Sequence, residues 1–278
     1  MLSLDKVKDF RVLLVGDGIT DDYRYVKPRG KSTKANTLSV ESLNRRETFH
    51  GGVWAAAEHV RGICGHVDVM TGRDVMKNTY YLDEIYTSKL FNVHELHRGV
   101  EEPKDYDIRD YDVVIVTDFG HGALTKELIE RIAKEARFVA VNAQTNSMNY
   151  GFNMITKYRR ADLVVIDEIE ARLAAHERDA PIEDVILALG FKKIIVTMGA
   201  NGAIGFDGAF ERQKSQADKV TDTIGAGDAF LAVCSPYAAA GASMKDLLTI
   251  GNAAGAIKVG IVGHRKSIDR ETLEAALA

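Results

Sequence analysis

Short, continuous runs of apolar residues alternate with helical patterns along this chain, and that alternation constrains the fold more than any other feature. The runs are rich in Val and Ile, which is typical of strands covered on both faces. They lie at 11–16, 67–70, 112–117, 138–141, 163–166 and 193–197. Helical patterns lie at 52–62, 125–134, 168–175 and 182–189, then after residue 230 through 240, at 243–259 and at 269–278. The sequence predicts an α/β fold of three layers, α/β/α, with a mostly parallel central sheet.

Two segments interrupt the alternation, 23–43 and 79–100, and both are rich in Tyr, Thr, Val and charged residues. Each follows a core strand and suits a small antiparallel sheet that projects from the main body. We interpret them as a small β lid on a single domain that spans residues 1–278. Two ordinary surface excursions are the alternative.

Composition limits the classes of function. With 278 residues and 46% hydrophobic composition, the chain can bury one large core. The net charge is -4 without an extended basic tract, so we expect neither nucleic acid nor a membrane as partner. Cys64 and Cys234 form no CxxC pair, which indicates reduced thiols in a cytoplasmic protein. The N-terminus lacks the apolar core of a signal peptide, and no run approaches about 18 apolar residues.

Three short motifs do not support the sites that they first bring to mind. The stretch GKST at 30–33 lacks the earlier glycine of a phosphate-binding P-loop, because that position is Tyr25. The stretch GDGITD at 16–21 has Asp21 where a dinucleotide fingerprint needs its third glycine. The stretch HELH at 94–97 has no further ligands for zinc, so we expect solvated side chains there.

The stretch DTIGAGDAF at 222–230 carries the chemistry. Gly225, Ala226 and Gly227 directly precede a helical pattern, so their amides and the helix dipole form an anion site. Asp228 adds a proton acceptor that is ionised at neutral pH if its pKa is near the usual 4. An anion site beside a base suits phosphoryl transfer to an alcohol. A glycine turn with Asp228 as an ordinary helix-start residue is the alternative.

This stretch resembles the C-terminal signature of the ribokinase-like (PfkB) carbohydrate kinases. Further matches cover essentially the whole chain, including VTMGANG at 196–202. Segments 15–25, 117–125 and 251–263 look most like D-glycero-D-manno-heptose-7-phosphate kinases, and 141–174 resembles a subgroup fused to a cytidylyltransferase. The signature of that nucleotidyltransferase does not occur in this chain. The resemblance implies transfer of the γ-phosphoryl group of ATP, with Mg²⁺, to a hydroxyl of a sugar or sugar phosphate, most plainly a heptose 7-phosphate.

The resemblance also assigns residues to roles. Asp228 is the expected base and Gly225, Ala226 and Gly227 the anion hole, with a monovalent cation such as K⁺ near that loop. The sugar is expected at Asp17, Asp21, Gly51 and Gly52. The nucleotide is expected at Thr197, Gly199, Gly202, Asn252 and Asp167, with Mg²⁺ held through water by Glu170.

Three positions depart from the family pattern. Ala55 replaces an asparagine that contacts sugar, His121 replaces a lysine, and Asp167 replaces an asparagine near the phosphates. These changes keep a kinase for another sugar or a nucleoside open, and also a non-catalytic sugar-phosphate sensor.

The expected lid gives two further expectations, of which the first concerns its basic stretch. Arg29 and Lys31 lie in VKPRGKSTK, and we expect them to bind a phosphate already present on the sugar, with a solvated basic loop as the alternative. In the family that this chain resembles, lid sheets of this kind often pair with a second copy, which buries their exposed edge strands, so the resemblance implies a homodimer.

Overall fold

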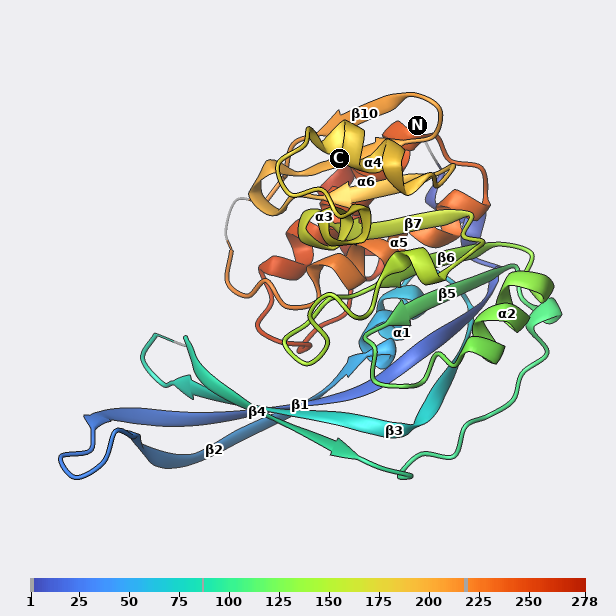
Figure 1. Ribbon diagram of the computed structural model, residues 1–278. Coiled ribbons are helices and arrows are strands. Elements are labelled where there is room, and N and C mark those ends of the chain that lie inside the picture. Colours follow the sequence, from blue (N-terminus) through green and yellow to red (C-terminus); the bar gives the residue numbers. More distant parts are fainter. Residues whose placement is uncertain (1–2, 87, 218–219) are drawn as a thin grey trace.

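The computed structural model describes residues 3–86, 88–217 and 220–278 (Figure 1). Ten strands in these residues form one sheet in the order β10-β9-β8-β7-β6-β5-β1-β3-β4, with β2 paired to β1 outside that row. The strands are β1 (Arg11–Lys31), β2 (Leu38–Gly52), β3 (His66–Asp83), β4 (Lys89–His97), β5 (Val113–Asp118), β6 (Val139–Ala143), β7 (Leu163–Asp167), β8 (Ile194–Thr197), β9 (Ala203–Phe206) and β10 (Phe210–Gln213). The helices are α1 (Val53–Arg61), α2 (Lys126–Glu135), α3 (Glu168–Ala175), α4 (Ile182–Leu189), α5 (Ala226–Ala239), α6 (Met244–Val259) and α7 (Arg270–Leu277).

The sheet lies between two layers of helices, because alternate residues of its strands enter two separate apolar clusters. Val12 and Leu14 of β1 pack with α1, α5, α6 and α7, whereas Leu13 and Val15 pack with α2, α3 and α4. All six residues of β5 are buried, as expected for a strand covered on both faces. The predicted three-layer α/β/α class is therefore confirmed, and each of the six expected core strands is present.

Strand β1 is much longer than its apolar run because it changes partner halfway. Residues 12–16 pair with β5, and residues 18–31 pair with β2 instead. Strand β3 pairs in parallel with residues 11–26 of β1, with an irregularity between Gly16 and Gly18. Strand β4 then pairs antiparallel with β3. Residues 18–31, 38–52, 75–83 and 89–97 form a four-stranded extension, which we call the outer sheet. Figure 1 shows it reaching away from the helices.

Two elements were missed by the sequence patterns. Strands β9 and β10 have four residues each and form the far edge of the sheet, where β10 is largely exposed and carries no apolar run. No helix among the described residues is both long enough and apolar enough to span a membrane.

Candidate active site

A cavity of about 890 Å³ opens at the carboxyl ends of the parallel strands, where ligands bind in open α/β sheets. Its walls come from the loops after β5 to β8, the starts of α3 and α5, helix α6 and the outer sheet. Of the residues expected from sequence, it is lined by Asp21, Gly52, Asp167, Glu170, Thr197, Gly199, Gly202, Gly225, Ala226, Gly227, Asp228 and Asn252. Most of the expected site thus comes together in one space.

Asp228 lies in the first turn of α5 and is buried. Its Oδ1 accepts a hydrogen bond of 2.6 Å from Gln144 Nε2, in the loop after β6. Burial raises the pKa of Asp228 to about 6, while His264, Lys258 and the Gln144 hydrogen bond act in the opposite direction. The carboxylate is therefore a stronger base than a free aspartate and still mostly ionised at pH 7.

The loop that carries the expected anion hole, Gly225 to Gly227, turns sharply into α5; we call it the anion-hole loop. Gly225 caps the helix with φ of +76°, and a Cβ there would meet His264 Cε1 at 3.0 Å. The first amides of a helix have no intrahelical acceptor, and the dipole adds positive charge there. Ala226 N–H makes only a long contact of 3.4 Å with the carbonyl of Thr223. The amides at this turn can therefore receive the oxygens of a phosphoryl group.

Asp21 faces the cavity from the part of β1 that has left β5. Its Oδ1 accepts from Asn78 Nδ2 at 3.0 Å, and its Oδ2 lies 3.5 Å from His264 Nε2. A Cβ on Gly51 would meet Asp21 Oδ2 at 2.7 Å, and Gly52 has φ of +58° against the carbonyl of Asp17. The glycine pair is thus needed for β2 to pass close to β1 and Asp21.

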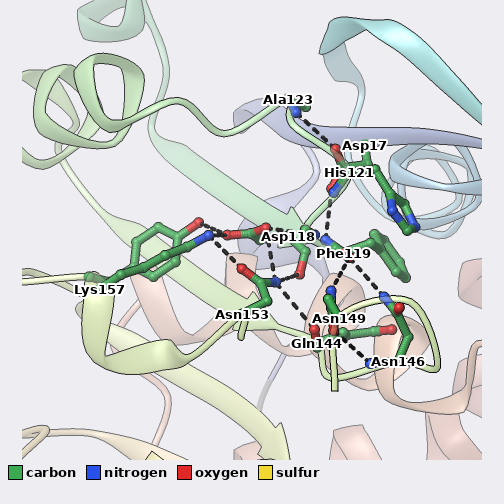
Figure 2. Close-up of polar contacts among 12 residues, drawn as sticks. Asp17, Asp118, Phe119, His121, Ala123, Gln144, Asn146, Asn149, Asn153 and Lys157 are labelled. Carbon is green, nitrogen blue, oxygen red and sulfur yellow. Dashed lines mark hydrogen bonds and ion pairs between the residues drawn. The ribbon is translucent and has the colours of Figure 1, made fainter. Parts of the chain in front are cut away.

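Asp17 lies outside the cavity lining, although sequence placed it with the sugar. Its carboxylate accepts backbone hydrogen bonds from Phe119, His121 and Ala123, at 2.8, 3.3 and 2.9 Å. Figure 2 shows the loop after β5 curled around it. Burial raises the pKa of Asp17, against these hydrogen bonds. In this structure Asp17 holds the loop that presents His121 to the cavity.

The other side of that loop is held by the polar segment after β6 (Figure 2). Asn146 and Asn149 both donate to the carbonyl of Phe119, at 2.8 and 2.7 Å. Lys157 pairs with Asp118 at 2.5 Å at the end of β5. These contacts fix the loops after β5 and β6 against each other and so position Gln144.

Asp167 and Glu170 form a capping box at the start of α3. Asp167 Oδ1 accepts from Glu170 N at 2.7 Å, and Glu170 Oε2 accepts from Asp167 N at 2.9 Å. Burial raises the pKa of Glu170 to about 8, with Asp167 as the next cause. The described residues contain no group of three or more His, Cys, Asp and Glu side chains that could hold a metal. The two carboxylates that line the cavity here suit Mg²⁺, which is bound mainly by phosphates, water and one or two carboxylates.

At the opposite wall, Asn252 Nδ2 is buried without a hydrogen-bond partner in the described residues. A buried unpaired amide is costly, which is consistent with a ligand acceptor at this position. Thr197, Gly199 and Gly202 lie around the end of β8 and the short turn after it.

Three expected features lie away from the main cavity. Arg29 pairs with Glu41 near the tip of the outer sheet, and neither Arg29 nor Lys31 lines the cavity. Arg29 is eight positions beyond Asp21 in the sequence, which is about 26 Å along an extended strand. Ala55 lines a second cavity of about 610 Å³ instead.

Several residues that line the cavity were not predicted from the sequence. His94 was expected to be solvated, but it lines the cavity, and its Nδ1 lies 2.7 Å from Asn78 Oδ1. His264 lies between Asp21 and the anion-hole loop. Gln144 directly follows a core strand, and that position was the available signal for it.

A buried carboxylate beside helix N-terminal amides, at the carboxyl ends of a parallel sheet, defines a phosphotransferase that acts on hydroxyl groups. The pfkB family of carbohydrate kinases matches residues 99–270. The chain belongs to this family, and the expected enzyme class, an ATP-dependent sugar kinase, is confirmed at that level.

Similar proteins agree with this assignment. A bifunctional protein HldE from Desulfatibacillum aliphaticivorans is 33% identical over 177 residues, covering 60% of this chain and 35% of the relative. Another from Nitratiruptor sp. is 23% identical over 294 residues, covering 91% of this chain and 62% of the relative. The chain thus spans less than two thirds of the length of these relatives.

Solved structures show the fold. A ribokinase from Arabidopsis thaliana, complexed with ribose and ATP, aligns with a TM-score of 0.70 at 17% identity over 97% of this chain and 99% of that one. Phosphofructokinase-2 from Escherichia coli, in complex with potassium, aligns with a TM-score of 0.69 at 15% identity over 96% of this chain and 98% of that one. At such identities, the likeness establishes a ribokinase-like fold and no finer property.

Proposed function

We propose that this chain transfers the γ-phosphoryl group of ATP to a hydroxyl of a sugar phosphate, with a heptose 7-phosphate as the first candidate. The observation that carries the proposal is the buried Asp228 beside the helix N-terminal turn at Gly225. Both groups line the same cavity as Asp21. The similarity to proteins named HldE supports the sugar class.

The reaction follows from the roles of these groups. Asp228 takes the proton from the acceptor hydroxyl as its oxygen forms a bond to the γ-phosphorus, and the bond from that phosphorus to the β-bridging oxygen breaks. ADP leaves with the electron pair of the broken bond. The amides of Gly225, Ala226 and Gly227 stabilise charge on the transferred oxygens. Asp21 and Asn78 orient acceptor hydroxyls.

Asp167 and Glu170 are proposed as the residues that would hold Mg²⁺ through water, and the ion would offset negative charge on the phosphates of ATP. The raised pKa of Glu170 reflects a buried carboxyl beside another carboxylate, and a nearby cation lowers it again. Glu170 is fixed by two backbone donors, Thr145 N at 3.0 Å and Asp167 N at 2.9 Å. It is therefore preorganised to receive a water of the hydrated ion.

A second candidate is an unphosphorylated sugar or a nucleoside. Among the described residues that line the cavity, none is Lys or Arg, and the cationic candidates are His94, His121 and His264. A phosphate on the acceptor would therefore be held by imidazoles and amides rather than by a fixed charge. Burial lowers the pKa of His121, so that imidazole favours its neutral form.

The test is ADP release from Mg-ATP with a panel of heptose 7-phosphates, hexose phosphates, free sugars and nucleosides, run beside Asp228→Asn. We expect turnover with one class and a loss of about 10²- to 10⁴-fold in kcat in the variant. Turnover of unphosphorylated compounds alone would select the second candidate. ATP binding without turnover of any compound would contradict kinase activity on these classes and favour a sensor.

We further propose a homodimer formed through the outer sheet, in the cytoplasm. Strand β2 is paired on one side only and most of its residues are exposed, as are Phe91 and Val93 on β4. The free, buried thiols of Cys64 and Cys234 are consistent with a reducing compartment. Light scattering that finds only a 30.5 kDa species at working concentration would contradict the dimer.

A further inference from the structure

One ammonium group is enclosed beside the anion-hole loop, although no step of the proposed reaction uses it. Lys258 lies in the last turn of α6, and its side chain is fully buried. Its Nζ donates hydrogen bonds to the carbonyl oxygens of Ile224, at 2.7 Å, and of Gly263, at 2.9 Å. Because lysine is almost never fully buried without a partner, this position calls for a physical reason.

The two carbonyls belong to the two segments that surround the anion-hole loop. Ile224 directly precedes Gly225, and Gly263 lies in the turn after α6. The Asp222 carboxylate joins the same segments through their N–H groups, at 3.2 Å from Ile224 N and 3.0 Å from Gly263 N. A cation that binds carbonyls and an anion that binds amides therefore hold these segments together.

Lys258 also packs directly against the loop whose amides receive the phosphoryl group. A Cβ on Gly225 would lie 3.3 Å from Lys258 Cε. Burial lowers the pKa of Lys258, whereas the carboxylates of Asp222 and Asp228 oppose that change and favour the charged ammonium. The charged form thus has acidic neighbours on two sides of the loop.

We propose that the Lys258 ammonium is the permanent cation of the anion-hole loop, so that this kinase needs no monovalent metal ion there. Carbonyl oxygens that converge on one point repel one another, and either an alkali-metal ion or an ammonium offsets that repulsion. The residues present do not fit an alkali-metal ion between Ile224 and Gly263, because the lysine Nζ already fills that position. The inference rests on the proposed function and replaces the monovalent cation that the family resemblance implied.

In this role Lys258 is a positioning residue. It contacts the loop and not the transferred group, and its charge keeps the carbonyl of Ile224 turned inward. The amides that follow in sequence then stay directed toward the cavity. Removing the ammonium is expected to lower kcat by roughly 10- to 100-fold, because the anion-hole amides lose their fixed orientation.

The test compares the wild-type chain with three variants in KCl and in tetramethylammonium chloride at equal concentration. Lys258→Ala removes the ammonium and opens space, and Lys258→Met keeps most of the length without the charge. Lys245→Ala is the matched control, because this lysine is exposed in the first turn of the same helix. The two readouts are ADP release with the acceptor found above and the Tm of the chain without substrate.

We expect the wild type and Lys245→Ala to have the same rate and the same Tm in both salts. Lys258→Ala should lose activity in tetramethylammonium and regain part of it in KCl with saturation. Its Tm should rise in KCl, because K⁺ binds the folded state only. Lys258→Met should be slow in both salts, since its side chain blocks the space without supplying charge.

Three results would overturn the proposal. The first is saturable activation of the wild type by KCl. The second is a rate of either Lys258 variant in tetramethylammonium that equals the wild-type rate. The third is a Lys258→Ala chain whose rate and Tm are both independent of KCl. If Lys258→Ala does not fold, the wild-type and Lys258→Met measurements still decide. The Tm readout needs no acceptor, so a failure of the proposed function leaves the cation test intact.

Discussion

The two ends of the cavity are built in different ways. At the proposed phosphoryl end, the loop amides and Asp228 come from one contiguous stretch, 222–228, held to the turn at 258–264 by the buried Lys258 ammonium and the partly buried Asp222 carboxylate. At the acceptor end, the polar side chains come from separate elements: Asp21, Asn78, His94 and His121. The phosphoryl end depends on backbone geometry that few residues can supply, whereas side chains at the acceptor end can be exchanged one at a time. Substitutions should therefore lower kcat at the first end and change the acceptor KM at the second.

The largest effect is expected for Asp228→Asn, with opposite signs for activity and stability. In the fold the pKa of Asp228 is raised to about 6, from a usual value of about 4. Ionisation of Asp228 therefore lowers the free energy of unfolding as the pH rises from about 4 to 6. The full loss is roughly 3 kcal/mol. Asparagine lacks this cost. The variant should lose kcat by about 10²- to 10⁴-fold yet have a higher Tm than the wild type at pH 8.

The stability difference should shrink as the pH is lowered from about 6 to about 4, because below that range Asp228 is protonated in both the folded and the unfolded chain. Thermal unfolding at pH 4, 6 and 8, in buffers without nucleotide, measures it. If the variant is less stable than the wild type at pH 8, burial of the ionised Asp228 carboxylate does not destabilise the fold.

A smaller loss is expected for Gly225→Ala. Gly225 has φ of +76°, and a Cβ there would crowd His264 Cε1 and Lys258 Cε, so the loop must shift. Loss of one oriented donor should lower kcat by about 10²- to 10³-fold. Gly208→Ala is the matched control, since Gly208 also has positive φ, +110°, with no atom within 4 Å. Both variants should lose about 1–2 kcal/mol of stability from backbone strain. If Gly225→Ala kept normal kcat, the anion hole would have to lie elsewhere.

Gln144→Leu should produce a moderate loss together with a shift in pH dependence. The wild-type kcat/KM should fall about tenfold per pH unit below about 6, because only the ionised Asp228 accepts the proton. The Gln144 hydrogen bond lowers that pKa, so its loss should move the acid limb to higher pH. At pH 7 a loss of roughly tenfold is expected. A limb that stays in place would show that Gln144 does not act on the base.

The same contrast explains what the sequence could reveal. The common position of Gly225, Gly227 and Asp228 was predictable because these residues are adjacent in sequence, and a helix start imposes one geometry on them. Gln144 was not, because 84 positions separate it from Asp228 and only the packing of β6 beside the sheet centre joins them. Lys258 carried no signal either. A single lysine at a helix end usually reaches solvent, and its burial depends on the turn that folds back over it.

The geometry of the outer sheet explains why the basic stretch does not reach the cavity of its own chain. A cluster of Lys and Arg indicates an anion site only if the chain brings it to the cavity. An extended strand instead carries each successive residue about 3.3 Å farther along. Arg29 and Lys31 therefore lie far from Asp21 on the same strand, whereas His94, on β4 at the other side of β3, reaches the cavity.

At the acceptor end, His94→Ala should change KM for the acceptor and not KM for ATP. His94 contacts Asn78, which in turn donates to Asp21, so its loss frees the group that orients the sugar. The acceptor KM should rise about 5- to 20-fold, the value of one or two hydrogen bonds. His97→Ala is the control on the same strand, as His97 lies outside the cavity lining. An equal rise in both variants would point to a disturbed β4 rather than to a lost contact.

The smallest effect is expected for Arg29→Ala combined with Lys31→Ala. Arg29 pairs with the exposed Glu41 near the tip of the outer sheet, and an exposed ion pair is worth about 0–1 kcal/mol. Within one chain, these side chains do not line the cavity, so the acceptor KM should stay within about twofold. The opposite result would be a large rise in KM for phosphorylated acceptors only, at enzyme concentrations that favour the dimer. Such a rise would have one physical explanation. The tip of one subunit would have to reach the cavity of the other, and the acceptor end would then be built from two chains.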